Sequence, residues 1–261
     1  MNLNSVVQAG SNFNAAQLAA ILAGDLTSQA KEGMVEERLP FTVRIVTRQE
    51  QLDKAVLIRH SAYGRHIPEV ASLLEKEEAA DREPGSVVLL AESKLDGSAL
   101  GTMRIQTNRY RKLALEQSIE LPSWLQGSSQ AEATRLGVAL GRTGRLAKTA
   151  MFKAYYEYCV MEGIEWMVIA ARSPLDRQYE ALLFKDVVPE GGFIPMRHAG
   201  NIPHRVLAFN IKLAEQNWRR AEHPLYSFVF ETSHPDIDAR GTVGLSVAGA
   251  RFPFAVTSTE N

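Results

Sequence analysis

Cysteine is nearly absent from this chain of 261 residues, which contains only Cys159. A single cysteine cannot form a disulfide within the chain, and such usage fits a reducing compartment. Cys159 stands among aromatic residues in a helical pattern, so we interpret it as a small buried apolar side chain rather than a nucleophile. The fold must then rest on a hydrophobic core, for which an apolar content of 45% is enough.

Long apolar runs are also missing. The stretch Ala15–Gly24, AAQLAAILAG, is apolar but too short to span a bilayer. We interpret it as an amphipathic helix that docks on the domain or on a partner, with contact to a membrane surface as a further alternative. The N-terminus also lacks the basic start and long apolar core of a secretory signal. These absences, with the lone cysteine, predict a cytoplasmic protein without a transmembrane segment.

An excess of one charge is the third absence. Lysine and arginine number 29 and aspartate and glutamate 30, which gives a net charge of −1. Nucleic-acid binding is therefore not expected, because such domains usually carry a basic excess. A local basic group remains, in or beside the segments that we assign to the site; its members are Arg142, Arg145, Arg172, Arg177 and Arg197.

What the sequence does contain is a strand–turn–helix pattern over 131–163. An apolar strand pattern, 134–140, leads into the turn Gly141-Arg142-Thr143-Gly144-Arg145, and an amphipathic helix pattern follows. Such a turn can direct unpaired backbone N–H groups and the positive end of the helix dipole toward an anion such as a phosphate.

The remaining segments can be arranged around this unit. A highly charged segment, 67–83, is interpreted as a surface excursion that could act as a flap, and Asp96-Gly97 predicts a hairpin turn. Other strand patterns occupy 41–46, 87–91, 99–107, 166–171, 192–196, 205–211 and 225–230, and other helical patterns occupy 49–63, 175–184 and 212–223. The order predicts one α/β domain with a mixed sheet flanked by helices. We divide the chain into an N-terminal arm (1–40), this domain (41–222) and a C-terminal extension (223–261).

Three small motifs resemble those of acyl-homoserine-lactone synthases, enzymes of the GNAT acyltransferase fold. Glu132-Ala133-Thr134-Arg135 resembles their Glu-x-Ser/Thr-Arg signature. Arg59 and Tyr63 match an Arg-x-x-x-aromatic helix, and Arg104 matches an arginine on the hairpin strand before the signature. The resemblance covers about residues 41–222. It implies a mostly antiparallel central sheet and transfer of an acyl group from a thioester.

Related long-chain N-acyl amino acid synthases share these motifs, and two later stretches, Pro174–Phe184 and Pro203–Leu207, resemble that group more. The lactone synthases also carry a Trp and paired Asp residues after their first helix. Here that region reads His66-Ile67-Pro68-Glu69, so we expect the Trp and the acidic pair to be absent. The resemblance therefore favours an N-acyl amino acid synthase.

The turn before the long helix departs from the GNAT phosphate loop. Arg142 and Ala147 match the ends of the Gln/Arg-x-x-Gly-x-Gly/Ala pattern, but Arg145 stands where the middle glycine belongs. This departure is expected if the donor is an acyl carrier protein, whose own surface shares the binding, rather than free coenzyme A. No tightly bound cofactor is implied, only an acyl-phosphopantetheine thioester as co-substrate.

The resemblance also implies roles for individual residues. Glu132 is the candidate general base, directly or through a water, and Tyr179 the candidate acid for the departing thiolate. Arg59, Arg104 and Arg135 could pair with the carboxylate of the acceptor or hold Glu132 in place. The residues expected to contact the thioester oxyanion or the phosphates are Gly137, Val138, Arg142, Gly144 and Arg145; Tyr63 is expected at the substrate.

Each of these residues also has a structural interpretation. Glu132 could be a solvated residue at a strand edge, Arg59 and Arg135 could be members of buried ion pairs, and Tyr63 could be a packed core aromatic. No metal site is expected, because a lone His with one Asp, His234-Pro235-Asp236, cannot fill a coordination shell.

Glu132 and Arg135 pose a geometric problem. Residues three apart in a regular strand point to opposite faces, so the two side chains could not both face one substrate. Either a β-bulge redirects one of them, or Arg135 is a structural ion on the other face.

The function predicted from the sequence is transfer of a long-chain fatty-acyl group from an acyl carrier protein, or from coenzyme A, to the α-amine of an amino acid. One alternative is an acyl-homoserine-lactone synthase that uses S-adenosylmethionine. Another is a non-catalytic sensor of acyl ligands on the same fold.

Overall fold

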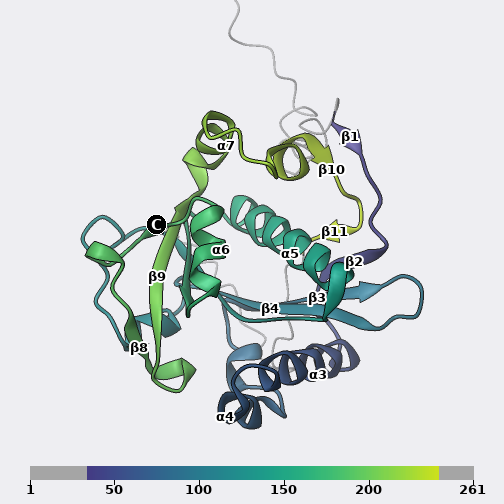
Figure 1. The fold of residues 1–261 in the computed structure, drawn as a ribbon, viewed down its shortest axis with the longest axis horizontal. Coiled ribbons are helices and arrows are strands. Elements are labelled where there is room, and N and C mark those ends of the chain that lie inside the picture. The colour runs from purple at the N-terminus through teal and green to yellow at the C-terminus, as the bar shows by residue number, and fades with distance from the viewer. Residues whose placement is uncertain (1–33, 241–261) are drawn as a thin grey trace, which may run out of the picture.

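The computed structural model describes residues 34–240, which form a mixed sheet with helices on both faces (Figure 1). The spatial order of the strands is β11-β2-β3-β4-β5-β6-β9-β7, and β8 pairs with β9. Only the β5–β6 and β11–β2 pairs of this sheet are parallel. The predicted fold class, a mixed and mostly antiparallel sheet flanked by helices, is therefore confirmed.

The central strands carry nearly continuous apolar side chains, as expected for a sheet covered on both faces. The strands before the central helix are β2 (Phe41–Ile45), β3 (Ser86–Ser93), β4 (Ala99–Thr107) and β5 (Gln130–Val138). Those after it are β6 (Trp166–Ala171), β7 (Lys185–Asp186), β8 (Ile194–Met196), β9 (Ile202–Asn210) and β11 (Ile237–Asp238).

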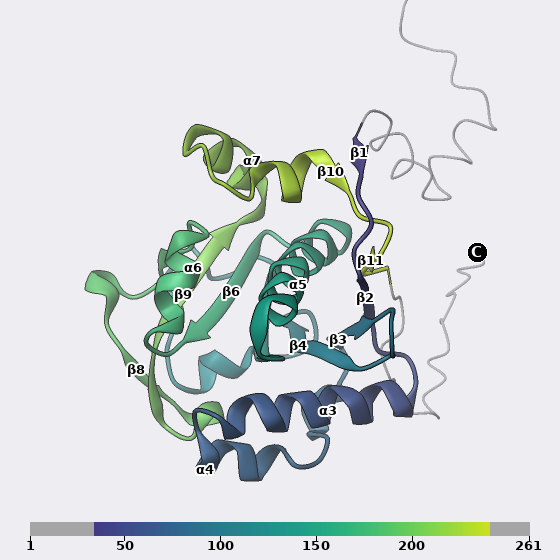
Figure 2. The same cartoon turned by 45° about the vertical axis from the view of Figure 1, so that its right-hand side comes forward.

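Helices lie against both faces of the sheet (Figure 2). The long helix α5 (Gly141–Met161) buries an apolar side that includes Ala150, Met151 and Tyr155, and it covers the face opposite α3 (Gln49–Gly64) (Figure 2). The other helices are α4 (Pro68–Ala71), α6 (Leu175–Ala181) and α7 (Ile211–Arg220). None of the helices in residues 34–240 is both long and apolar enough to cross a membrane.

The predicted strand at 225–230 is wrong. Ser227–Glu231 form a π-helical turn whose aromatic rings pack around the end of α7: the Phe230 ring lies 5.6 Å from the fully buried Trp218. A short apolar run does not by itself distinguish a strand from a buried helical turn. The predicted helix at 175–184 also ends earlier, at Ala181, and Phe184 enters the core.

The turn predicted over Gly141–Arg145 is already the first turn of α5. Gly144 permits this, because a Cβ there would lie 1.8 Å from the carbonyl oxygen of Ala139. The charged segment 67–83 is also more than a surface excursion. It contains α4, the 3₁₀ turn Ser72–Leu74 with its buried Leu74, and the 3₁₀ turn Ala79–Asp81 with its buried Asp81.

Strand β5 departs from regular geometry where the sequence motif lies. Thr102 stands opposite Gly137 and Arg104 opposite Thr134, so two β5 residues, Arg135 and Leu136, face the single β4 residue Met103. Arg135 has a positive φ of 56°. This is a β-bulge, the first of the two possibilities for Glu132 and Arg135. On its other side β5 pairs with β6 only over Gln130–Ala133, so the two strands separate beyond that point.

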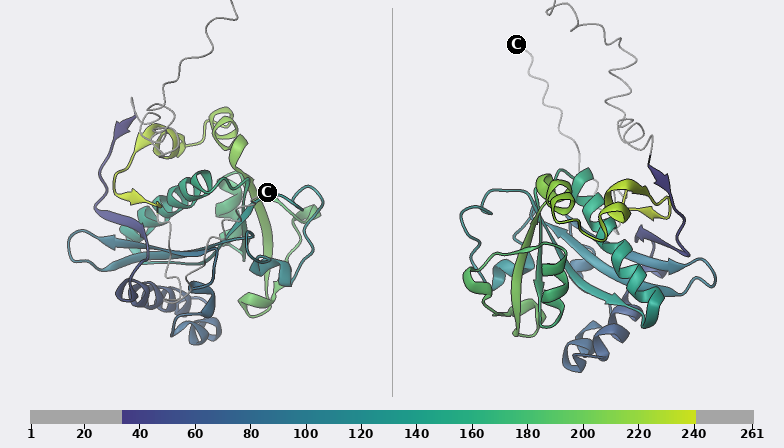
Figure 3. Two further views of the ribbon diagram at one scale, coloured as in Figure 1. Left: turned by 180° about the vertical axis from the view of Figure 1, so that it is seen from behind. Right: turned by 45° about the horizontal axis from the view of Figure 1, so that its top comes forward.

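The two ends of the described chain lie together (Figure 3). The strands β1 (Val35–Glu36) and β10 (Thr232–Ser233) form a small parallel sheet, and β11 adds an edge to the main sheet beside β2. Residues after 222 thus contribute to the sheet, while the division into arm, domain and extension stays a prediction. The helix expected at 15–24 lies outside the described residues.

Candidate active site

A cavity of about 450 Å³ opens where β5 and β6 separate. Its wall combines residues of α3, β5, β6, α6 and the 3₁₀ turn η5 (Arg197–Ala199). Five of the residues predicted for the site line it: Tyr63, Arg135, Gly137, Val138 and Tyr179. The β5 backbone from Thr134 to Val138 has no β6 partner, so its N–H and C=O groups on that edge are available to a ligand.

The bulge directs Arg135 toward an acidic residue from the segment after α3. The Nε and Nη2 atoms of Arg135 donate to the two carboxylate oxygens of Glu78, each at 2.7 Å. Nη2 also donates to the backbone oxygen of His198 at 3.0 Å. Arg135 therefore joins three segments at the cavity wall, and it is 9% exposed.

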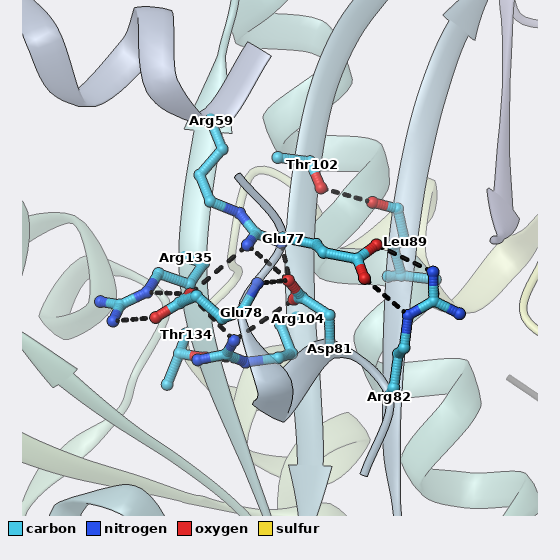
Figure 4. A network of polar contacts seen from close by, with 10 residues as sticks. All are labelled: Arg59, Glu77, Glu78, Asp81, Arg82, Leu89, Thr102, Arg104, Thr134 and Arg135. Atoms are coloured by element: carbon cyan, nitrogen blue, oxygen red, sulfur yellow. Dashed lines mark hydrogen bonds and ion pairs between the residues drawn. The ribbon is translucent and has the colours of Figure 1, made fainter. Parts of the chain in front are cut away.

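Behind this wall lies a buried network of three arginines and two carboxylates (Figure 4). Arg59 on α3 donates from both Nη atoms to Asp81, each at 2.9 Å, and both side chains are fully buried. Arg104 on β4 reaches Glu78 at 3.0 Å, Asp81 at 3.3 Å and the hydroxyl of Thr134 at 3.2 Å.

Arg59 and Arg104 thus face carboxylates of the protein, and neither lines the cavity. This position agrees with the interpretation of Arg59 as a buried ion-pair member, and Arg104 has the same role although the sequence did not suggest it. Direct contact of either arginine with a substrate stays a prediction. Burial alone would raise the pKa of Glu78, but the hydrogen bond from Arg135 and the charges of Arg104, Arg135 and Arg59 outweigh it and lower the pKa to about 2. The network contains one more positive than negative charge when all five groups are ionised.

Glu78 and Asp81 were not identified from the sequence. The acidic pair was expected at 66–69, immediately after the first helix, and is absent from those residues. An acidic pair is present further along, at Glu78 and Asp81, in a segment whose many charges concealed it. This pair is a Glu with an Asp and lies outside 66–69, so the expected absence of the Trp and paired Asp residues of the lactone synthases stays a prediction. No signal in one sequence singles out these two among the acidic residues of 67–83.

Glu132 lies beside this network and is fully buried. Its Oε2 accepts a hydrogen bond from the backbone N–H of Leu115 at 3.2 Å. Burial raises the pKa of Glu132 to about 7, although backbone groups of Leu115 and Ala114 and the charges of Arg104 and Arg135 lower it. A carboxyl group with this pKa is suited to exchange a proton near neutral pH. The interpretation of Glu132 as a solvated strand-edge residue is wrong.

His198 is a second titratable residue of the site that was not identified from the sequence. It lies on η5, lines the cavity, and places Nε2 3.9 Å from Oε1 of Glu132. Burial, the positive charges of Arg135 and Arg104, and His204 lower the pKa of His198 to about 4, so its ring is neutral at pH 7. Its position in a short turn between two strands gives no pattern by which a sequence could identify it.

Tyr179 joins the first cavity to a second one. The second cavity, of about 500 Å³, lies between α5, α6 and the segment after α7. Its wall is mostly apolar and includes Met103, Phe152, Tyr155 and Leu225. Tyr179 and Leu136 line both cavities. Burial and the nearby Tyr63 raise the pKa of Tyr179, so its phenol remains a proton donor at neutral pH.

The predicted phosphate-binding residues lie in the first turn of α5. Arg142 and Arg145 are exposed, and neither has an ion-pair partner among residues 34–240. The N-cap residue, Leu140, provides no side-chain cap for the helix. The first N–H groups of α5 are therefore open to an anion, whereas Gly144 has the packing role described above. No three His, Cys, Asp or Glu side chains within 34–240 are grouped so as to hold a metal.

Comparisons with known proteins give a match in structure but not in sequence. No protein-family model matches the chain, and no curated protein matches it in sequence. Among solved structures, FeeM, an N-acyl amino acid synthase from uncultured soil microbes, superposes with a TM-score of 0.56 at 17% identity, covering 72% of this chain and 96% of FeeM.

Two further similar structures match less well. One is a CoA-dependent acyl-homoserine-lactone synthase, BjaI, with a TM-score of 0.49, 15% identity, and coverage of 76% of this chain and 96% of that one. The other is Arabidopsis thaliana NAA60 with acetyl-CoA, with a TM-score of 0.44, 15% identity, and coverage of 66% and 99%. At such identities a likeness establishes the fold alone. The chain has a single GNAT-like α/β domain, as predicted from its motifs.

Proposed function

We propose that this protein is an acyltransferase that moves a long-chain acyl group from a phosphopantetheine thioester to the α-amine of an amino acid. One observation carries the proposal. The bulged strand β5 lines the first cavity, which we call the polar cavity because Arg65, Arg135 and Arg172 stand in its wall, and this cavity shares Leu136 and Tyr179 with the apolar second cavity. A thioester at this junction has an apolar space for its chain and a polar space for the acceptor.

The proposed path of the donor follows the separated strands. The pantetheine arm enters between β5 and β6, where the backbone beyond Ala133 lacks a sheet partner. The phosphate lies at the open first turn of α5, near Arg142 and Arg145. Four exposed or half-buried arginines, Arg142, Arg145, Arg172 and Arg177, form what we call the basic rim. An acidic carrier protein suits this rim better than a neutral partner does.

In the proposed arrangement the acyl chain occupies the apolar cavity. Its aromatic and aliphatic wall, including Phe152, Tyr155 and Leu225, suits a chain of methylene groups, each of which gains about 0.8 kcal/mol on burial. The acceptor occupies the polar cavity, where Arg65, Arg172 and Arg135 supply positive charge for its carboxylate.

The chemistry requires a neutral amine, a stabilised oxyanion and an acid for the thiolate. Glu132 is the base, since its pKa of about 7 leaves much of it ionised at neutral pH. Free N–H groups of β5 near Gly137 and Val138 stabilise the oxyanion. Tyr179, at the junction of the cavities, protonates the leaving thiolate.

A second candidate is a synthase of acyl-homoserine lactones. The acidic pair Glu78 and Asp81 supports it, because two carboxylates that follow the first helix bind the arginines of the motifs. The acceptor would then be S-adenosylmethionine, and the product a lactone.

The test is to incubate the full-length protein with long-chain acyl carrier protein, or acyl-coenzyme A, and a pool of amino acids that includes S-adenosylmethionine. Mass spectrometry should identify an N-acyl amino acid. Glu132→Gln should lower kcat/KM by about 10²- to 10⁴-fold while circular dichroism stays unchanged. A lactone product would establish the second candidate. A retained acyl thioester without turnover would instead indicate a sensor of acyl ligands, and full activity of Glu132→Gln would refute its role as base.

A further inference from the structure

Glu132 is separated from the cavity in which the acceptor would bind. Its carboxyl group is fully buried, and it is not part of the cavity wall. One oxygen, Oε2, accepts the hydrogen bond from Leu115, while Oε1 has no hydrogen-bond partner among the described residues. An unpaired oxygen on a buried carboxyl group is costly unless another group uses it.

His198 fills the space between Glu132 and the cavity. Its side chain is 12% exposed and lines the cavity, and its Nε2 atom lies 3.9 Å from the unpaired Oε1. The other ring nitrogen, Nδ1, also has no hydrogen-bond partner within residues 34–240. Oε1 of Glu132 thus lies next to Nε2 of His198, at a distance that a small side-chain movement would close to a hydrogen bond, and Nδ1 is a second unpaired, buried polar atom on a ring that lines the cavity.

The backbone around His198 is held on two sides. Its carbonyl oxygen accepts from Arg135 at 3.0 Å, and the N–H of Arg197 donates to the hydroxyl of Ser118 at 2.9 Å. Arg135 therefore fixes η5 against β5, the strand that carries Glu132. The backbone that carries the ring is therefore held by the residue at the bulge, Arg135.

We propose that His198 carries the proton between the acceptor amine and Glu132, so that the base of this enzyme is a histidine–glutamate pair rather than Glu132 alone. The proposal rests on the proposed acyl transfer, and adds to it a residue that none of the motifs includes.

The charges around the ring agree with this role. Arg135 on β5, Arg104 on β4 and His204 on β9 disfavour an imidazolium, whereas a backbone group of Ala114 favours it. The ring is therefore neutral at pH 7 and can accept a proton at one nitrogen while it donates from the other. An ionised Glu132 at Nε2 stabilises the charge that develops on the ring during this transfer.

The reaction balances as follows. The amine nitrogen forms a bond to the thioester carbonyl carbon and gives one proton to Nδ1 of His198, while the proton on Nε2 passes to Oε1 of Glu132. The carbon–sulfur bond then breaks, and the thiolate takes a proton from Tyr179. The proton held by Glu132 returns through His198 and replaces the one that Tyr179 lost, so an amide and a thiol leave and the protein is unchanged.

The experiment measures acyl transfer by the wild type, His198→Ala, His198→Gln and Glu132→Gln, with and without added imidazole. His60→Ala is the control, because His60 is a part-buried histidine on α3 that lines neither cavity. We expect His198→Ala and His198→Gln to lose about 10²-fold or more in kcat. Added imidazole should raise the kcat of His198→Ala about tenfold, because the shortened side chain leaves room for it. It should not raise the kcat of His198→Gln or Glu132→Gln. His60→Ala should retain its activity.

The outcomes separate this inference from the proposed function. Absence of acyl transfer by the wild type would refute the proposed function. If the wild type is active and Glu132→Gln is not, but both His198 variants keep wild-type kcat, Glu132 acts without His198 and the relay is refuted. A loss in His198→Ala that imidazole does not restore, with a thermal midpoint well below that of His198→Gln, would show a structural role and would also refute it.

Discussion

Two glutamates of the site show how the surroundings of a single residue determine its chemistry. Glu78 and Glu132 both lie near Arg104 and Arg135, yet the pKa of Glu78 falls to about 2 and that of Glu132 rises to about 7. Glu78 receives direct hydrogen bonds from Arg135, whereas Glu132 receives only one from a backbone N–H and is fully buried. Direct guanidinium contact outweighs burial in the first case, and burial outweighs distant charge in the second.

The raised pKa of Glu132 predicts a dependence of stability on pH. The folded protein holds the Glu132 proton up to about pH 7, while the unfolded chain releases it near 4.5, so the folded state binds more protons between these values. The contribution of Glu132 to the free energy of unfolding must then fall as pH rises through this window, by about 3 kcal/mol.

Urea denaturation of the wild type and Glu132→Gln at several pH values measures this effect, since the difference between them cancels all other titrations. We expect the free energy of unfolding of Glu132→Gln, relative to that of the wild type, to rise by about 3 kcal/mol between pH 4.5 and 8. The pH dependence of Glu78 has the opposite sign, because its pKa is lowered. Its contribution to the free energy of unfolding is present above about pH 4.5 and is lost as the pH falls below that value. A constant difference between the two proteins would show that Glu132 titrates normally.

Asp81 predicts a large loss of stability on substitution. In Asp81→Asn the fully buried Arg59 loses its two-point partner, and Arg104 loses one of its two carboxylates. Removing one partner of a buried pair costs about 3–5 kcal/mol, because the remaining charge stays buried. The matched control is Glu77→Gln in the same segment, whose pair with Arg82 is partly exposed and contributes about 1 kcal/mol or less. Equal urea midpoints for the two variants would contradict the structural role of the network.

At the residue scale the sequence predicts one half of the site and not the other. The short motif from Glu132 to Arg135, with Arg59, Tyr63 and Arg104, identifies residues on regular strands and helices that the fold does bring together. Glu78, Asp81 and His198 come from short irregular segments, and only the folded chain places them beside the motif. Long-range ion pairs follow from topology, and no local pattern records them.

At the scale of elements, the strand–turn–helix of β5 and α5 is the part that the sequence describes best. Both elements were predicted. The sequence pattern did not determine the bulge at Arg135 or the separation of β5 from β6. A bulge depends on how two strands are paired in register. The alternation of apolar and polar residues along one strand does not determine where an extra residue shifts that register. The π-helical turn at Ser227–Glu231 was missed for a similar reason, because packing against Trp218 rather than local propensity decides its conformation.

The position of the apolar cavity beside α5 predicts control of chain length. Thr149 is a half-buried α5 residue whose side chain lines this cavity. Thr149→Phe should fill part of it and lower kcat/KM for long acyl chains by at least about tenfold, while short chains are affected little. Val160→Phe, at an exposed position in the last turn of the same helix and in neither cavity wall, is the control. Competition between donors of different chain lengths measures the ratio of kcat/KM for long and short acyl chains. An unchanged ratio would show that the acyl chain binds elsewhere.

At the scale of the whole molecule, the chain ends close one edge of the sheet. The N–H of Leu39 donates to Asp236 at 2.8 Å, and Lys94 forms an ion pair with the same carboxylate at 2.7 Å. Lys153 on α5 donates to the backbone oxygen of Phe228, so the segment after α7 is fixed to the central helix as well. This segment also supplies Leu225 to the apolar cavity. The part of the sequence with the loosest pattern therefore helps to form the proposed acyl site.

The distribution of charge over the molecule gives the last prediction, which concerns the donor. The net charge is −1, yet the four arginines of the basic rim have no ion-pair partner among residues 34–240; Arg172 lines the cavity, and the other three lie on α5 and α6. If an acidic carrier protein docks there, Arg145→Glu should raise KM for the acyl carrier protein by about tenfold at low salt and leave kcat unchanged. The effect should shrink at 0.5 M salt, because exposed charges are then screened within a few ångströms. Lys212→Glu, the same change of charge on α7 and away from both cavities, should have no effect. Equal KM values for Arg145→Glu and the wild type at low salt would show that the carrier protein docks elsewhere or is not the donor.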